Sequence, residues 1–559
     1  MAKFVLIDHS LKDLGGHHYP YAYNVLAAAR RAGWQPVLVT HRRFAQQAAL
    51  PPEWRVHALY AHESYSRYTL DTQAQLTTPA PGASKTRWHR TRQWWGARVR
   101  ERLATRFARD CARLFELEPV GRGDQVFIAT TSELDLSGLT AFLGRSAVGL
   151  DCDWHLQFHF GLFQGREPDY AAQVGAAAAM RSSIAKSLSQ SGKQRLHFYC
   201  TTEQLTSQYR RLGVAEFVTL PYPVHELFRP RAAAHSSAAP LRIACLGHSR
   251  REKGYAQLPR ILRALWSDWF APGRAQLVLQ TRHRGPRRAL EHLIASLPSD
   301  GQGGRSALDF AGFPLPLARY AQLLCSADVG LMLYDATRYY ARCSGVLLEM
   351  LCAGVPVLVP AGGWLADQIE FENQRYLDEI ALQAPQATPC PESGAIDVRD
   401  GQQSLLITCH WRADAGAGEY LRLNFAMHDG SGANLGLAMA IVGPRAPPAP
   451  VRTLLRLPAG CARVQISMYN AWQRDAPPAA QPEWALLPEA TPMGALGLTI
   501  AAGAEVPRLL RDVLEHCGHY RARVAAHAAN CAQAHSGIAV LAGLGVRVAP
   551  SIAEPSATT

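Results

Sequence analysis

Short apolar runs alternate with amphipathic segments along the first 230 residues and again from residue 241. Strands that alternate with helices are typical of βαβ units and parallel sheets. The pattern predicts two doubly wound α/β halves, joined near residues 221–230, with a cleft at the carboxyl ends of both sheets. Strands are predicted at 4–7, 35–40, 125–130, 155–160, 197–200, 241–246, 276–280, 307–310, 329–334 and 355–359, and the first helix at 21–32.

The pattern changes after about Asp378, where helical periodicity fades. Turn clusters such as Asp429-Gly-Ser-Gly separate runs that are typical of antiparallel strands. Five or more strands within about 100 residues favour a β-sandwich. The strands are predicted at 404–411, 420–428, 435–442, 451–457 and 463–469, after which a strand at 494–500 and helices through 541 resume the α/β pattern.

The composition favours a globular chain of about three domains. The chain has 559 residues, of which 48% are apolar and 18% charged. Its first strand begins almost at the initiator Met, and no apolar run of bilayer-spanning length is free of charge, so we expect a cytoplasmic protein. The 12 cysteines are scattered without zinc-ligand spacing, and we expect reduced, mostly buried thiols.

The net charge of +13 predicts attraction to an anionic partner. Ten basic residues lie between Lys85 and Arg113, against only Glu101 and Asp110, and Trp side chains are interleaved with them. This segment fits either a peripheral contact with an anionic membrane face or a solvated helix packed on its own domain. No nucleic-acid-binding motif accompanies the charge, so we expect no nucleic acid partner.

The segment 340–360 offers a site for a pyrophosphate. Ser344 and Gly345 open an apolar helix, whose first backbone N–H groups and positive dipole end favour an anion. Val346 follows in the first turn. Glu349 lies one helical turn further on, able to accept hydrogen bonds from ribose hydroxyls.

Two other turns follow predicted strands. The sequence Leu246-Gly-His-Ser-Arg-Arg-Glu-Lys-Gly254 places Gly247, Arg250 and Lys253 directly after a strand. Gly15 and Gly16 follow the first strand and precede His17 and His18, and adjacent glycines let a backbone approach a ligand closely. The pattern is not G-x-G-x-x-G, so a dinucleotide cofactor lacks its fingerprint.

These motifs together resemble the retaining GT-B glycosyltransferases of family four. The helix resembles the family's E-x7-E region, with Ala341 in place of the first Glu and Arg342 and Ser344 forming an R-x-S-G-x-x-x-E variant. The basic turn is similar to the family's G-R-L-x-x-E-K-G, in which Lys253 and Gly254 match and His248 stands at the usual Arg position. The resemblance implies that Lys253, with Arg250 or Arg251, neutralises a donor diphosphate.

The resemblance also implies roles for the first half. The glycine loop at Gly15 and Gly16 would lie against the donor phosphates, with His17 and His18 as candidates for contact with the acceptor or the donor sugar. His159, predicted at the end of a strand, would face the transferred sugar. For each of these histidines the alternative is a purely structural role, in which the ring is hydrogen-bonded within the core or a loop.

The match skips the β-rich stretch. In the family, the Gly-Gly turn that corresponds to Gly362-Gly363 is followed closely by a strand, which arrives here about 130 residues later, at Gly494. An inserted domain explains the delay. We therefore predict an acceptor-side domain at 1–229, a donor-side domain at 230–385 and 490–559, and an inserted sandwich at 386–489.

The resemblance implies transfer of a sugar from a nucleoside diphosphate sugar to a saccharide or lipid-linked saccharide acceptor, with retention and without a metal or other cofactor. Two alternatives remain open. A sugar-nucleotide epimerase of the same fold would need paired acid and base carboxylates, which the motifs do not show. A sugar-nucleotide-binding scaffold without turnover is the other alternative, because the first Glu is missing.

Overall fold

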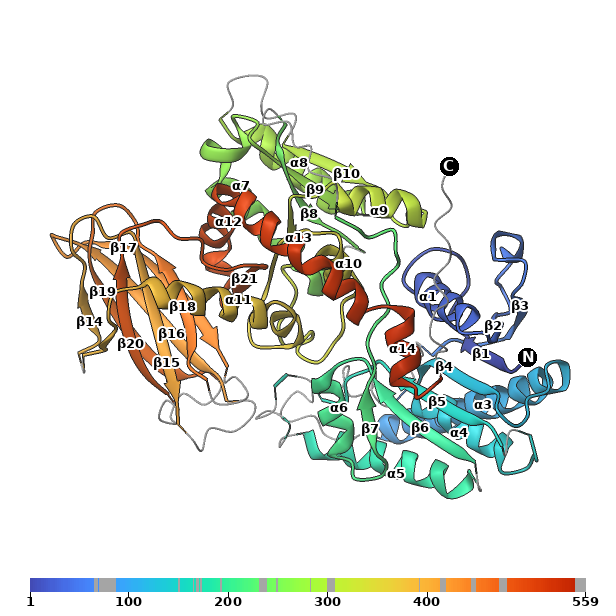
Figure 1. The fold of residues 1–559 in the computed structure, drawn as a ribbon. Coiled ribbons are helices and arrows are strands. Elements are labelled where there is room, and N and C mark those ends of the chain that lie inside the picture. The colour runs from blue at the N-terminus through green and yellow to red at the C-terminus, as the bar shows by residue number, and fades with distance from the viewer. Residues whose placement is uncertain are drawn as a thin grey trace.

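The structure is a computed structural model in which two α/β halves carry a separate antiparallel domain (Figure 1). The described residues are 1–64, 69, 87–148, 151–163, 165–166, 170, 173–191, 194–230, 239–247, 250–281, 283–298, 307–391, 393–412, 419–443, 449–471 and 480–547.

The first half is built on a parallel sheet of seven strands in the order β3-β2-β1-β4-β5-β6-β7. Successive residues of a strand face opposite sides, so Phe4 and Leu6 pack on the side of α1, whereas Val5 and Ile7 pack on the side of α3 and α4. The elements are β1 (Lys3–Asp8), α1 (His18–Arg31), β2 (Gln35–His41), β3 (Arg55–Tyr60), α3 (Arg87–Leu117), β4 (Gln125–Thr131), α4 (Glu133–Leu143), β5 (Asp153–Phe158), α5 (Val174–Gln190), β6 (Arg195–Cys200), α6 (Glu203–Arg210) and β7 (Phe217–Thr219).

The second half repeats this plan with six parallel strands in the order β10-β9-β8-β11-β12-β21. The strand order reverses between β8 and β11, as it does between β1 and β4 in the first half, and such switch points are where α/β sheets bind ligands. The elements are β8 (Leu241–Cys245), α7 (Leu258–Ala264), β9 (Ala275–Gln280), α8 (Arg284–Ser296), β10 (Leu308–Ala311), α9 (Leu317–Cys325), β11 (Val329–Leu331), α10 (Gly345–Cys352), β12 (Val357–Pro360), α11 (Trp364–Gln383), β21 (Gly497–Ile500), α12 (Val506–Glu515), α13 (Cys517–Ala534) and α14 (Gly537–Gly543).

The β-domain lies between α11 and β21 in the sequence and consists of two four-stranded antiparallel sheets. Along β16 every second residue, from Leu421 to Met427, is buried between the sheets. The outer face of the β13-β20-β15-β18 sheet contributes Leu406, Leu454 and Leu487 to a cluster with Tyr376 and Leu377 of α11. The strands are β13 (Thr388–Pro389), β14 (Ala395–Asp397), β15 (Ser404–Trp411), β16 (Leu421–Asp429), β17 (Asn434–Val442), β18 (Val451–Arg456), β19 (Cys461–Asn470) and β20 (Ala480–Leu487).

The side chain of Asn373 joins the two ends of the insertion. Its amide nitrogen donates to the Gly497 carbonyl at 3.0 Å, and its oxygen accepts from the backbone N–H groups of Ala495 and Leu496 at 2.8 and 2.9 Å. Asn373 lies on α11, before the insertion, whereas the three backbone groups lie after it. The α11 helix therefore positions β21 in the second sheet, although about 100 residues of another domain intervene in the sequence.

The last helix of the chain returns to the first half. Segment 535–541 contacts the connection between the halves, where the Val224 N–H donates to the His535 carbonyl at 2.7 Å. Val540 and Leu541 of α14 share one apolar cluster with Tyr21 of α1 and Leu347 of α10. This cluster holds the two halves against each other. Among the described residues, no helix combines the length and the apolar character that crossing a bilayer requires.

The predicted fold class is confirmed: two Rossmann-like parallel sheets, as in the GT-B architecture, and an inserted antiparallel sandwich. Five strands were missing from the prediction, namely β3, β7, β13, β14 and β20. In β20, Pro482 and Glu483 interrupt the apolar pattern, and in β3, Arg55 and His57 do so. The first helix begins at His18 rather than at Tyr21, and β5 ends at Phe158 rather than at Phe160.

We expect Asn373→Ala to lower the free energy of unfolding of the second half by about 3 kcal/mol, because it leaves buried backbone groups of β21 without partners. Urea unfolding followed by circular dichroism measures the change. Asn434→Ala, at the exposed first residue of β17, is the matched control and should change stability by less than about 1 kcal/mol. Equal effects of the two substitutions would contradict the role given to Asn373.

Candidate functional site

The predicted site residues lie at the carboxyl ends of the two parallel sheets, where the halves face each other. Gly15 and Gly16 follow β1, His159 follows β5, and Gly247 follows β8. Ser344 and Glu349 come after β11, at the start and middle of α10. The two strand-order switch points therefore supply most of the candidates.

Gly247 makes room for the amine of Lys253. A Cβ added to Gly247 would lie 2.4 Å from the Lys253 Nζ, and the backbone of Gly247 has a φ of +87°, which other residues rarely adopt. The Gly247 N–H donates to the Gln280 Oε1 at 2.8 Å, which fixes the turn after β8. The predicted pair of Gly247 and Lys253 is thus one packed unit.

Lys253 is enclosed by protein on several sides. Its Nζ lies 4.9 Å from the centre of the Tyr334 ring and donates to the Leu246 carbonyl at 3.5 Å. Burial lowers the pKa of its ammonium group, and the nearby charge of Arg250 acts in the same direction, while Glu349 opposes both. A desolvated ammonium group attracts an incoming anion more strongly than an exposed one does.

Arg250 is more exposed than Lys253 and bends toward Glu252, with 3.8 Å between its Nη1 and the carboxylate. The proximity of Arg250 is also one of the causes that lower the pKa of His17, which belongs to the first half. Arg250 is therefore the basic residue that faces the glycine loop. His248 lies outside the described residues, and the side chain of Arg251 is likewise not described.

Helix α10 begins where the sequence predicts an anion site. The Ser344 hydroxyl caps the helix by accepting from the Leu347 N–H at 3.4 Å. Tyr222, from the connection between the halves, packs on the first residue, because a Cβ at Gly345 would lie 3.1 Å from the Tyr222 ring. Val346 lies next to Gly247, since its Cγ2 is 3.6 Å from the position of a Gly247 Cβ. The start of α10 and the Lys253 turn are therefore adjacent.

Glu349 is held by Tyr320 of α9, whose hydroxyl donates to the Glu349 Oε2 at 2.8 Å. Burial raises the pKa of the Glu349 carboxyl to about 7, although the Tyr320 hydrogen bond and Lys253 both favour the ionised form. A ligand that donates hydrogen bonds, such as a pair of ribose hydroxyls, would stabilise the carboxylate further.

Ala341 and Arg342 do not join this group. Ala341, at the position of the family's first Glu, is only 5% exposed and packs in the core of the first half. Its carbonyl accepts from the Thr202 hydroxyl at 2.8 Å, so the position forms a contact between the halves. Arg342 lines a small pocket that it shares with Gly161, Phe163 and Arg338, among others.

The three candidate histidines lie together at the edge of the first sheet. The rings of His17 and His18 are 4.2 Å apart, and the His18 Nδ1 lies 2.9 Å from the Asp8 Oδ2. The His159 Nε2 donates to the Ala129 carbonyl at 2.7 Å, and burial lowers the pKa of His159 to about 4. Desolvation also lowers the pKa of His17, with His18, His159 and Arg250 acting in the same direction. His159 is therefore a neutral imidazole at pH 7.

The glycine loop reaches across to the second half. A Cβ at Gly15 would lie 3.5 Å from the Pro314 Cβ, which belongs to the loop between β10 and α9. Gly16 has a φ of +77° and nothing within 4 Å of its Cβ position. The loop thus spans the space between the halves, with Gly16 open to a ligand.

Sequence reasoning missed several residues that shape this site. Asp8 orients His18. Asp8 comes directly after the strand predicted at 4–7, and this position was a signal that could have identified it. Tyr320, Gln280 and Tyr222 carried no such signal, because each reaches the site from an element remote in the sequence.

No family model and no curated protein matches the chain. Solved structures do match it. Sucrose-phosphate synthase from Thermosynechococcus elongatus is 17% identical, with a TM-score of 0.43 over 67% of this chain and 85% of that one. A structure described as trehalose-6-phosphate from E. coli bound with UDP-2-fluoro glucose is 14% identical, with a TM-score of 0.42 over 66% and 86%.

The glycosyltransferase WaaG, involved in lipopolysaccharide biosynthesis, is 14% identical, with a TM-score of 0.37 over 65% of this chain and 83% of that one. At these identities and TM-scores, the likenesses assign no chemistry or substrate.

The raised pKa of Glu349 predicts a pH-dependent loss of stability. Between pH 4.5 and about 7 the folded chain keeps a proton that the unfolded chain has released, so this carboxyl lowers stability as pH rises through that window. Glu349→Gln should therefore gain stability relative to the parent chain, by about 1–3 kcal/mol more at pH 8 than at pH 5. Urea unfolding at both values measures the difference.

Glu291→Gln is the control, because Glu291 is an exposed residue of α8 that pairs with Arg287 one turn away. Its stability difference from the parent should not change between pH 5 and pH 8. A pH-independent effect of Glu349→Gln would show that Glu349 titrates normally.

Proposed function

We propose that this protein is a glycosyltransferase that moves a sugar from a nucleoside diphosphate sugar to an acceptor hydroxyl, with retention of configuration. The observation that carries the proposal is the convergence of the Lys253 ammonium, the start of α10 and the Glu349 carboxylate at the carboxyl edge of the second sheet. The Lys253 ammonium and the start of α10 suit the binding of a diphosphate, and the Glu349 carboxylate suits the hydroxyls of a ribose.

In this proposal, residues 230–385 and 490–559 bind the donor. Lys253 and Arg250 bind the diphosphate, with backbone N–H groups at Ser344, Gly345 and Val346. Glu349 accepts from the ribose hydroxyls, and Gly247 leaves room for Lys253. Gly15 and Gly16 approach the phosphates from the first half.

The chemistry follows from the charge distribution. When the acceptor oxygen bonds to the anomeric carbon, the bond from that carbon to the diphosphate breaks, its electron pair stays on the diphosphate, and the proton of the acceptor hydroxyl passes to the departing diphosphate oxygen. Desolvated Lys253, Arg250 and the dipole of α10 stabilise that developing charge, so these groups supply the electrophilic assistance without requiring a metal ion. The neutral imidazole of His159 is suited to hydrogen-bonding the hydroxyls of the transferred sugar.

Residues 1–229 bind the acceptor in this proposal. His17 and His18 stand at the start of α1, facing Arg250, where an acceptor hydroxyl would approach the donor. The acceptor class that we propose is a saccharide or a lipid-linked saccharide.

A sugar-nucleotide-binding scaffold without turnover is the second candidate. The burial of Ala341 favours it, because the position that the resemblance assigns to an acid forms a contact between the halves here. Binding of a donor without product would support this candidate over the transferase.

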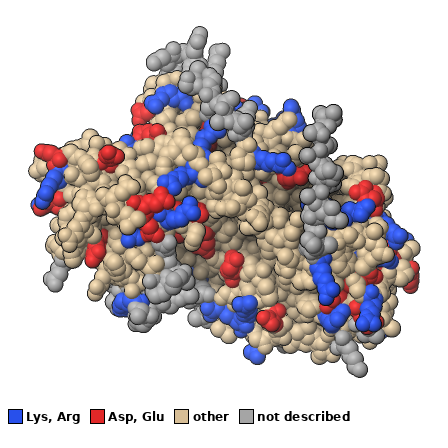
Figure 2. All heavy atoms as spheres, in the orientation of Figure 1, with Lys and Arg blue, Asp and Glu red and all other residues tan. Residues whose placement is uncertain are grey.

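A lipid-linked acceptor would place the protein at a cytoplasmic membrane face, and α3 offers a surface for that contact. Its buried face contains Phe107, Cys111 and Leu114, so the segment is anchored in its own domain and does not insert along its length. Its exposed side carries Arg98, Arg102, Arg106, Arg109 and Arg113 at helical spacing, next to Trp95, which is 60% exposed. Elsewhere, on the face drawn in Figure 2, basic and acidic side chains are interspersed.

We expect one class of nucleotide sugar to raise the melting temperature of the protein in a panel of UDP-, GDP- and ADP-sugars, because a donor binds only the folded state. Lys253→Ala should abolish this shift and lower the rate of sugar transfer at least 100-fold. Lys186→Ala, an exposed lysine of α5, is the control and should behave as the parent. No shift with any donor, for a folded parent protein, would refute the proposal.

We expect the protein to sediment with vesicles that contain 30% phosphatidylglycerol and not with vesicles of phosphatidylcholine alone. Reversing the charge at Arg102, Arg106 and Arg109 with Glu should abolish sedimentation, because each arginine near an anionic surface contributes about 1 kcal/mol. The same charge change at Arg284, Arg287 and Arg288 of α8 is the control. Equal loss in both variants would assign the binding to net charge alone.

A further inference from the structure

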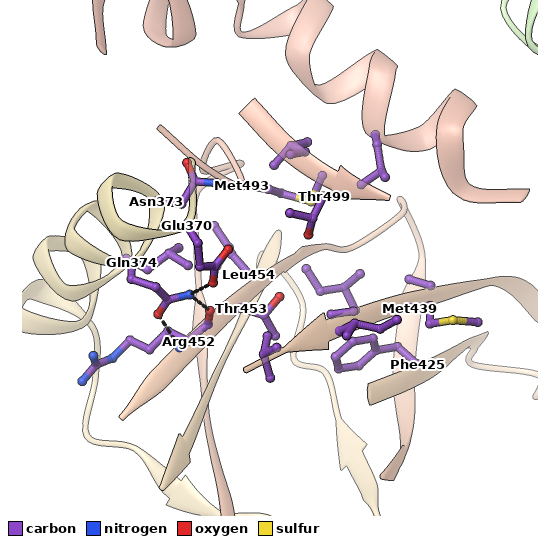
Figure 3. A pocket seen from close by; sticks show the side chains of 18 of the residues that line it. Glu370, Asn373, Gln374, Phe425, Met439, Arg452, Thr453, Leu454, Met493 and Thr499 are labelled. Carbon is purple, nitrogen blue, oxygen red and sulfur yellow. Dashed lines mark hydrogen bonds between the residues drawn. The ribbon is translucent and has the colours of Figure 1, made fainter. Parts of the chain in front are cut away.

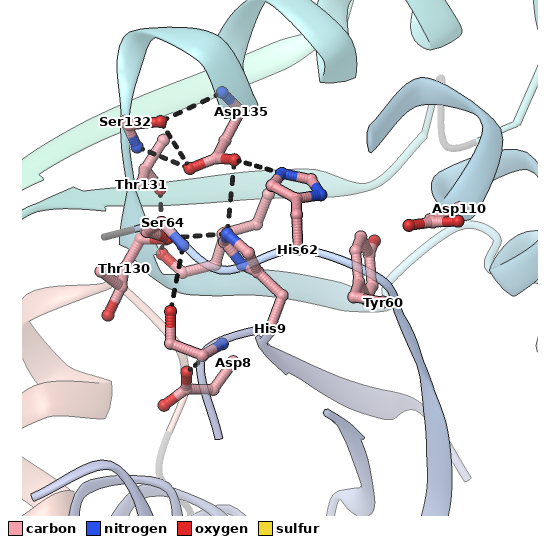
Figure 4. A network of polar contacts seen from close by, with 12 residues as sticks. Asp8, His9, Tyr60, His62, Ser64, Asp110, Thr130, Thr131, Ser132 and Asp135 are labelled. Atoms are coloured by element: carbon pink, nitrogen blue, oxygen red, sulfur yellow. Dashed lines mark hydrogen bonds and ion pairs between the residues drawn. The ribbon is translucent and has the colours of Figure 1, made fainter. Parts of the chain in front are cut away.

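A buried polar cluster lies behind the candidate site, at the carboxyl edge of the first sheet (Figure 4). His9 follows β1, His62 follows β3, and Asp135 lies in the first turn of α4. The side chains of His9, His62 and Asp135 are 0%, 9% and 1% exposed. None of the roles proposed for the transferase uses these three residues.

The three side chains converge on one point. The Asp135 Oδ2 accepts from the backbone N–H and the hydroxyl of Ser132, at 2.9 and 2.7 Å, so the carboxylate is fixed by its helix cap. The other oxygen, Oδ1, faces both imidazoles, at 3.3 Å from the His9 Nε2 and 3.2 Å from the His62 Nε2. All three atoms lie within 4.8 Å of one another.

The two separations between the Asp135 Oδ1 and the imidazole nitrogens fit a tetrahedral metal ion. Ligands bound at about 2.0 Å to a tetrahedral centre are about 3.3 Å apart, since the edge of a tetrahedron is about 1.6 times the distance from its centre to a corner. Two imidazoles and one carboxylate suit Zn²⁺ or Co²⁺ better than Mg²⁺ or Ca²⁺, which prefer oxygen ligands alone.

The surroundings also favour a cation. Besides Asp135, the carboxylates of Asp8 and Asp110 lie near this point, and the Asp110 Oδ2 accepts from the backbone N–H of Ala61, next to His62, at 3.1 Å. The Nδ1 atoms of His9 and His62 are buried without a hydrogen-bond partner in the part of the chain that the structure describes, so no contact there fixes which ring nitrogen carries the proton, and both Nε2 atoms are able to present a lone pair to an ion.

We propose that His9, His62 and Asp135 bind one divalent transition metal ion, of the zinc class, with a water as the fourth ligand. The Ser64 hydroxyl lies 2.6 Å from the His9 Nε2, shorter than the separation of two ligands on one ion, and donates to the Thr130 carbonyl at 2.9 Å, so it borders the site as a hydrogen-bonding neighbour. Burial makes the site structural, because a substrate has no access to it.

The ion would fasten three segments that meet at the first switch point. It would join the end of β1, the connection after β3 and the start of α4. Asp8 precedes His9 and orients His18, so the metal would stabilise the frame of the glycine loop without touching the reacting groups.

The test uses the full chain, purified and dialysed, with metal content measured by mass spectrometry. We expect about one zinc ion per chain after incubation with ZnSO4, and a melting temperature that falls by several degrees when EDTA removes it. His62→Gln and Asp135→Asn should each hold less than a tenth of an ion and show no EDTA effect. His57→Gln, a histidine of β3 paired with Glu118, is the control and should match the parent.

Titration of the parent chain with CoCl2 tests the site independently of any variant. A tetrahedral nitrogen and oxygen site should give visible absorption bands that saturate at one equivalent and vanish on addition of zinc. If the parent chain holds less than a tenth of an equivalent of metal and zinc does not change its melting temperature, the cluster is a metal-free hydrogen-bond network and the proposal is wrong. Undiminished zinc binding in both His62→Gln and Asp135→Asn would also overturn it.

Discussion

One continuous apolar cluster fixes the geometry on which the rest of the structure depends. It includes residues of α1 in the first half, of α10 in the second half and of α14, the last helix. Because the inner face of α10 belongs to this cluster, Ser344 and Glu349 are held at a set distance from the first half. Burial of apolar surface, at roughly 25 cal/mol per Å², thereby holds the polar groups of α10 in place at the cleft.

The charges in the cleft are tuned by desolvation more than by pairing. Burial lowers the pKa of Lys253 and raises that of Glu349, and each is opposed by the other. Neither group forms a close salt bridge with the other among the contacts of the described residues. Both therefore remain available to a ligand that carries phosphate and hydroxyl groups, and ligand binding would relieve the electrostatic cost of burying them.

Periodicity and turn chemistry were sufficient to predict the two parallel sheets and most strands of the insertion, because both patterns are local. The adjacency of Gly247, Lys253 and α10 also followed from position, since all come after strands of one sheet. The pairing of Tyr320 with Glu349, the burial of Ala341 and the cluster around His9 did not. Each depends on contacts between residues at least 29 positions apart, which a single sequence does not encode in any local pattern.

The position of α14 has a consequence for how the chain is made. Synthesis proceeds from the N-terminus, yet the side of α1 that contacts α14 is covered only when residues 537–543 arrive. β21 likewise completes the second sheet only after the whole sandwich has been synthesised. During translation, this apolar surface of the first half stays exposed while more than 300 further residues are synthesised. A chain truncated before α14 would leave the surface uncovered permanently.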